Sequence, residues 1–96
     1  MKFKELNKKS YFRDRIDDLY TEDSIAYFEE IKVKDIKEDE MVYDRIHIHF
    51  KDDGTISKSV DTLVQSKEDW DSIWSRVEFV SEKEMYRRVI KYIWEK

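Results

Sequence analysis

Residues 45–55 read Arg-Ile-His-Ile-His-Phe-Lys-Asp-Asp-Gly-Thr, and this stretch decides the fold. Its apolar residues alternate with polar ones, which is the period-two pattern of a half-buried strand. An Asp-Gly pair directly after such a strand is a strong signal for a hairpin turn. We therefore predict one strand over residues 42–51 and a return strand over about 55–63.

A third strand and three helices complete the predicted order. Residues 25–36 fit either a strand or a helix, and we assign them to a strand because they are β-branched and alternating. Ser66 and Ser81 each precede apolar residues at helical spacing and have an acidic residue three positions later, which is typical of helix starts. The predicted helices cover residues 10–20, 66–76 and 81–95.

The predicted fold class is α+β. We expect a three-stranded antiparallel meander with helices on one face, in the order α-β-β-β-α-α. The length of 96 residues predicts a single compact domain over 1–96. Trp70 and Trp74 lie at helical spacing, so we expect both to pack against the sheet.

Composition narrows the possible functions. Charged residues make up 44% of the chain and aromatic residues 15%, and there is one Gly, no Pro and no Cys. These counts exclude a disulfide framework, a thiolate metal site and a thiol nucleophile. No catalytic motif, membrane-spanning segment or signal-peptide run is visible. We therefore expect a cytoplasmic, non-enzymatic protein without a cofactor.

Negative charge gathers in the middle of the chain. Residues 17–40 carry ten acidic and three basic residues. Clustered carboxylates can imitate the phosphates of a nucleic acid and occupy a basic groove on another protein. Ordinary solubilising charge is the alternative interpretation. The candidate partner-binding residues are Asp35, Glu38, Asp39, Glu40, Asp52 and Asp53.

The last helix offers a second kind of surface. Basic side chains can bind phosphate and aromatic rings can stack on bases. The net charge of −4 and intrahelical ion pairs such as Glu84 with Arg88 argue against this interpretation. Trp94 also suggests a dimer contact, together with the hairpin edge, in a toxin-immunity or structural module. The residues of this alternative are Arg87, Arg88, Lys91 and Trp94.

A metal site is a further hypothesis. His47 and His49 lie on one face of the predicted strand, and Asp61 on the return strand is a possible third ligand. Two histidines at this spacing also suit the polar face of a strand, so we predict no metal.

Three local features support a resemblance to a known family. They are the Asp-Asp-Gly turn at 52–54, the Trp-bearing helix that follows residues 66–69, and residues 82–86 at the start of the last helix. With the predicted element order, they resemble small phage-encoded anti-CRISPR inhibitors of Cas9. The resemblance implies that acidic side chains bind the DNA-recognition surface of a nuclease. The basic final helix departs from that pattern.

These observations predict a small phage or mobile-element inhibitor, monomeric or homodimeric. It would block a host defence protein through its acidic surface, with a nucleic-acid-binding nuclease as the candidate partner.

Overall fold

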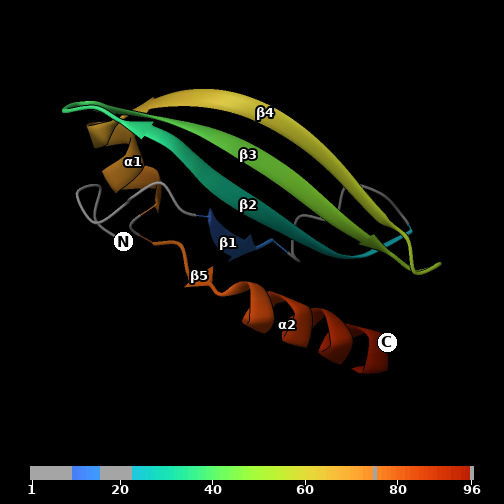
Figure 1. Cartoon of the computed structure of the whole chain (residues 1–96). Helices are drawn as coiled ribbons and strands as arrows, with labels where there is room; N and C mark the ends of the chain where they lie inside the picture. Colours follow the sequence, from blue (N-terminus) through green and yellow to red (C-terminus); the bar gives the residue numbers. More distant parts are fainter. Residues whose placement is uncertain (1–9, 16–22, 75, 96) are drawn as a thin grey trace.

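A five-stranded antiparallel sheet dominates the structure (Figure 1). The computed structural model describes residues 10–15, 23–74 and 76–95. The strands lie in the order β4-β3-β2-β1-β5, and the molecule measures 44 × 20 × 20 Å. The strands are β1 (Ser10–Asp14), β2 (Ser24–Ile36), β3 (Glu40–Lys51), β4 (Ile56–Ser66) and β5 (Phe79–Val80), and the helices are α1 (Lys67–Trp74) and α2 (Glu82–Glu95).

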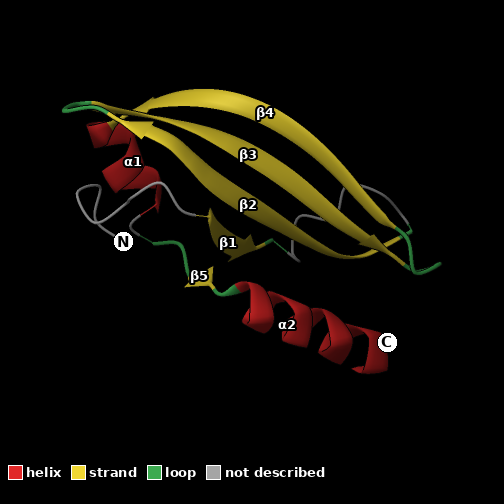
Figure 2. Ribbon diagram, in the orientation of Figure 1, coloured by secondary structure: helices red, strands yellow, loops and turns green. Residues whose placement is uncertain are grey.

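Two tight turns join the three long strands into consecutive hairpins (Figure 2). At the β3–β4 turn, the backbone N–H of Lys51 donates to the Thr55 carbonyl at 2.9 Å, and the N–H of Gly54 donates to the Lys51 carbonyl at 3.1 Å. Gly54 has a φ of 87°, a left-handed conformation that favours glycine. The predicted hairpin is confirmed, and residues 25–36 belong to a strand.

The predicted meander with the order α-β-β-β-α-α is wrong. Residues 10–14 form a strand, and β1 lies between β2 and β5 (residues 16–20 of the predicted helix lie outside the described residues). β1 pairs with β2 from Ser10↔Lys32 to Asp14↔Phe28. Apolar residues at helical spacing led to the wrong prediction of a helix over residues 10–20. β1 is too short to show a clear strand pattern, and the strand with which it pairs is distant in the chain. The two-residue β5 is too short to produce any periodic pattern.

The two helices pack on opposite faces of the sheet. Directly opposed residues on neighbouring strands share a face, and successive residues alternate between faces. We call the side of Ile31 and Tyr43 the α1 face, because α1 packs there, and the side of Phe28 and Ile48 the α2 face. Strand twist turns these faces along the sheet, so both helices lie below it in Figure 1. The expectation that the helices share one face is therefore wrong.

Both helices begin where the sequence predicts. The Ser66 hydroxyl accepts a hydrogen bond from the backbone N–H of Asp69 at 3.2 Å. The Ser81 hydroxyl accepts one from the N–H of Glu84 at 3.1 Å. Each serine thus satisfies a backbone donor that the first helical turn leaves unpaired.

Two separate apolar clusters form the core, one on each face. On the α1 face, Trp70 and Trp74 stack with ring centroids 5.0 Å apart and cover the sheet, which confirms their predicted packing. On the α2 face, Met85 and Val89 cover the strands. The α1-face cluster is Ile31, Val33, Met41, Tyr43, Trp70 and Trp74, and the α2-face cluster is Phe12, Ala26, Phe28, Ile48, Phe50, Met85 and Val89.

Two tryptophan substitutions test this distribution of burial. Trp70 is fully buried, whereas Trp94 is 84% exposed. We expect Trp70→Ala to lower the free energy of unfolding by about 3–5 kcal/mol, because it leaves a cavity between α1 and the sheet. The control Trp94→Ala should change it by no more than about 0.5 kcal/mol. Urea denaturation followed by circular dichroism measures both, and equal losses would contradict the assignment.

Candidate functional site

A chain of polar side chains crosses four strands on the α1 face. Arg13 on β1 donates a hydrogen bond to the Glu29 carboxylate on β2. The Tyr27 hydroxyl donates to the other Glu29 oxygen at 2.9 Å and also contacts Nδ1 of His47 on β3. Nε2 of His47 lies 3.3 Å from the Asp61 carboxylate on β4. We call these five residues the cross-strand network.

Strand pairing brings the cross-strand network together. Arg13 lies directly opposite Glu29, and Glu29 lies directly opposite His47. A slip of β1 by one residue on β2 would move Arg13 to the α2 face, and a slip of β2 by one residue on β3 would move Glu29 there. The network therefore holds the register of β1, β2 and β3.

The inner part of the network is buried. Tyr27, Glu29 and Arg13 are 0%, 2% and 7% exposed. The Arg13 guanidinium lies 4.2 Å from the centre of the Trp74 ring, within the range of a cation–π contact. Burial lowers the pKa of Arg13, and the Glu29 carboxylate opposes that shift. An arginine remains protonated at neutral pH under such conditions, so Arg13 and Glu29 form a buried ion pair.

A carboxylate, a phenol and an imidazole in series can carry out acid–base chemistry. Such chemistry needs a substrate space beside the titratable groups. Of two surface pockets lined by described residues, one includes Arg13 of the network, and neither includes Tyr27 or His47.

Removing both partners of the buried pair should cost less than the sum of the costs of removing each one alone. We expect Arg13→Met alone, or Glu29→Met alone, to lower the free energy of unfolding by about 3–5 kcal/mol, because each leaves an uncompensated buried charge. The double variant should lose clearly less than the sum of the two. A double-mutant cycle by urea denaturation measures this coupling. Strictly additive losses would contradict a buried pair.

His49 belongs to the same face but contacts Tyr27 by stacking. The two ring centroids lie 4.7 Å apart. Burial lowers the pKa of His49 below its ordinary value of 6.5, and the nearby His47 and Lys51 act in the same direction, whereas Asp23 opposes them. The folded protein therefore favours the neutral imidazole.

This pKa shift makes stability depend on pH. Below pH 6.5 the unfolded chain binds a proton at His49 more readily than the folded protein does. We expect the free energy of unfolding to fall as the pH drops through 6.5, and the contribution of His49 to level off below its lowered folded-state pKa. His49→Gln should reduce the slope just below pH 6.5. Urea denaturation at a series of pH values measures it, and an unchanged slope would contradict this role.

The three candidate metal ligands do not converge on one point. His47 lies near Asp61, whereas the His49 ring stacks on Tyr27. Among the residues that the structure describes, no group of three or more His, Cys, Asp or Glu side chains is arranged to hold a metal ion.

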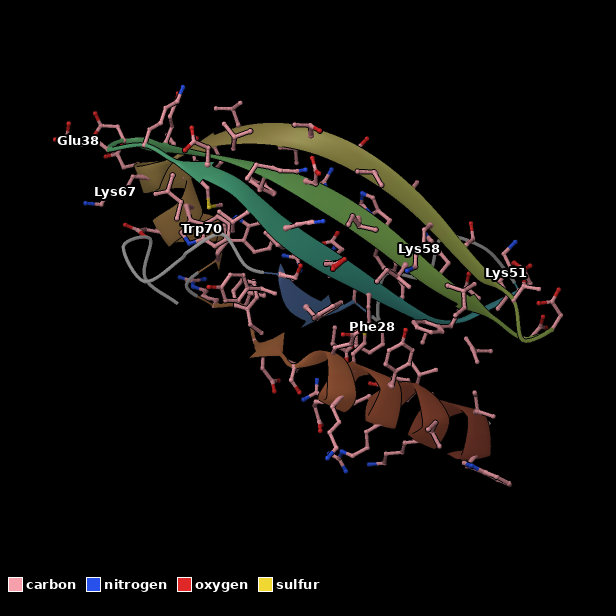
Figure 3. The ribbon with its side chains drawn as sticks, in the orientation of Figure 1. Phe28, Glu38, Lys51, Lys58, Lys67 and Trp70 are labelled. Atoms are coloured by element: carbon pink, nitrogen blue, oxygen red, sulfur yellow. The ribbon has the colours of Figure 1, made fainter. Side chains whose placement is uncertain are left out.

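The predicted acidic residues divide between the two ends of the sheet. Glu38 is at the β2–β3 turn, and Lys51 marks the end of β3 next to Asp52 and Asp53 (Figure 3). The 12 residues of β3 separate these ends by about 37 Å. At the far end, the Asp53 carboxylate accepts hydrogen bonds from the backbone N–H and hydroxyl of Thr55 at 2.9 and 2.6 Å, which lower its pKa. Asp53 thus stabilises the β3–β4 turn.

At the β2–β3 turn, the start of α1 adds carboxylates that the sequence analysis did not place there. The backbone N–H of Lys67 donates to the Asp39 carbonyl at 2.8 Å, which brings the start of α1 against the β2–β3 turn. A surface pocket lies between them, lined by Asp39, Ser66, Lys67, Glu68 and Asp71. We call residues 35–40 and 67–71 the acidic end. It holds Asp35, Glu38, Asp39, Glu40, Glu68, Asp69 and Asp71 against Lys37 and Lys67, so seven negative and two positive charges give a net −5.

The predicted basic surface on α2 is largely occupied by carboxylates. The Arg88 guanidinium lies 2.8 Å from Glu78 and 3.2 Å from both Asp14 and Glu84. Arg87 donates to Glu84 at 2.7 Å. These hydrogen bonds lower the pKa of Glu84 to about 2 and raise the pKa values of both arginines.

Lys91 and Trp94 complete the predicted α2 surface. Both are exposed, and the exposed fraction of Trp94 is 84%. With Arg87 and Arg88 engaged by carboxylates, the helix offers less free positive charge to a nucleic acid than its sequence suggests.

Sequence reasoning brought together only His47 and Asp61, as candidate metal ligands, and missed the buried part of the cross-strand network. The visible signal for the buried part was Glu29, a charged residue that follows the apolar run of residues 25–28. A carboxylate in such a position needs a buried partner. Arg13 could not be chosen, because the helix predicted over residues 10–20 concealed its place opposite Glu29.

No protein-family model matches this chain, and neither the curated proteins nor the solved structures contain a significant match. The described helices include none with the length and apolar character that a membrane crossing requires.

Proposed function

We propose that this chain is a small non-enzymatic binding protein whose acidic end engages a basic surface on another protein. The observation that carries the proposal is the convergence of the β2–β3 turn with the start of α1. This contact concentrates a net charge of −5 at one end of a chain whose total is −4. The rest of the protein is therefore close to neutral.

This uneven charge distribution orients the protein as it approaches a charged partner. A strongly negative end steers association with a positive surface and speeds encounter at low salt. Clustered carboxylates on a rigid turn and helix can also occupy the sites that phosphates use on a nucleic-acid-binding protein. The partner class is thus a host protein with a basic groove. A defence nuclease is the specific candidate, which would make this chain a phage or mobile-element inhibitor.

The proposed binding surface includes only some of the acidic residues of the chain. Glu38 and Asp39 belong to the acidic end, and Glu68 and Asp71 join them from α1. Asp52 and Asp53 lie at the opposite end of β3 and serve the other turn. They are therefore excluded from the binding surface.

Two matched charge-reversal variants test the proposal. Glu38→Lys/Glu68→Lys changes one turn residue and one residue in the first turn of α1. Asp52→Lys/Glu82→Lys makes the same change in net charge at the other turn and in the first turn of α2. Affinity capture from bacterial lysate with quantitative mass spectrometry, and inhibition of guide-directed DNA cleavage by Cas9, supply the readouts.

We expect the acidic-end variant to lose captured partners and any inhibition, while the control variant keeps both. Partner recovery should also fall with rising salt, because exposed charges are screened. Equal behaviour of the two variants would contradict the proposal. Circular dichroism confirms that both remain folded.

A further inference from the structure

The outer edge of β4 is long, and no other described strand covers it. β4 is the last strand in the sheet order, and it pairs with β3 without a register shift from Glu40↔Ser66 to Phe50↔Ile56. No residue that the structure describes pairs with its other edge. Natural proteins usually shield such an edge with proline, bulges or several charges. β4 has no proline or bulge against β3, and its charges are limited to Lys58 and Asp61.

Apolar side chains line this exposed strand at regular intervals. Ile56, Val60 and Val64 are 50%, 58% and 62% exposed. They lie on the α2 face, opposite Phe50, Ile46 and Val42 respectively. Their spacing of four residues makes the apolar pattern of β4 symmetric about Val60.

The backbone N–H and C=O groups that β4 directs away from β3 are also arranged symmetrically about Val60. The hydrogen bond from Lys51 to Thr55 closes the hairpin, and antiparallel pairs alternate between bonded and non-bonded after it. Odd-numbered residues of β4 therefore bond to β3, and even-numbered residues direct their N–H and C=O groups outward. Val60 is one of the residues with outward-facing groups.

We propose that two copies of this chain pair antiparallel through β4, with Val60 on the two-fold axis. This register places Ile56 opposite Val64 of the second copy and Val60 opposite Val60. The polar side chains are also compatible with this register, because Lys58 lies opposite Thr62 and Asp61 lies opposite Ser59. The two five-stranded sheets join into one continuous sheet.

Neighbouring registers fit less well. A pair centred on Asp61 sets two carboxylates directly opposite each other, which is destabilising. A pair centred on Ser59 sets Ile56 opposite Thr62 and loses the apolar matches. Only the Val60-centred register combines three apolar pairs with no directly opposed like charges. A C2 interface of this kind is the commonest form of homo-oligomer. The proposed dimer through β4 does not depend on the binding function proposed for the acidic end.

Sedimentation velocity across a dilution series from micromolar to near-millimolar protein tests the association. We expect the wild type to form dimers and Val60→Lys to weaken dimerisation by about tenfold or more, because it sets two like charges opposite each other at the axis. Ile90→Lys is the matched control, since Ile90 is 55% exposed on α2 and should leave dimerisation unchanged. A wild type that stays monomeric throughout, or equal weakening by both variants, overturns the proposal.

Spin labelling tests the register separately. The chain has no native cysteine, so Ile56→Cys and Val64→Cys each give a single labelling site. In the Val60-centred pair, each site lies eight residues from its counterpart, about 27 Å along the strand, so both variants should give similar distances by pulsed electron paramagnetic resonance. A shift of the centre by one residue lengthens one distance by about 7 Å and shortens the other. Clearly unequal distances overturn the register.

Discussion

The buried ion pair between Arg13 and Glu29 is the constraint on which the sheet depends. β1 contributes only five residues, yet it lies inside the sheet between β2 and β5. An unpaired buried guanidinium or carboxylate is costly, and Arg13 faces Glu29 directly in the observed register. The pair therefore selects one alignment of β1 on β2. Tyr27 and His47 extend this selection to β3.

Strand twist explains how so small a chain covers both faces of its sheet. α1 and α2 lie at different ends of the long strands, and each covers the face that turns toward it there (Figure 1). β2 is consequently buried on both sides in its first half, where Ala26, Tyr27, Phe28 and Glu29 are all nearly inaccessible. A strand covered on both faces loses the simple alternation of a half-covered one.

Exposed carboxylates and exposed apolar side chains lie on separate parts of the molecule. Carboxylates gather at the β2–β3 turn and α1, whereas large exposed apolar side chains occur on β4 and α2. The arginines of α2 are paired with Asp14, Glu78 and Glu84, so these two side chains offer little free positive charge. The two proposed contacts, self-association along the edge of β4 and binding of a basic partner at the acidic end, use different residues.

The sequence by itself determined the features that depend on near neighbours. These are the β3–β4 hairpin, the strand character of β2, the serine caps of both helices and the burial of Trp70 and Trp74, because alternation, turn chemistry and capping act over a few residues. Tertiary structure decided the rest. The pairing of β1 with β2, the cross-strand network, the opposite faces of the two helices and the contact of Lys67 with Asp39 join residues distant in the chain. No local period encodes such pairings, since their stability comes from burial and charge compensation that exist only once the sheet has formed.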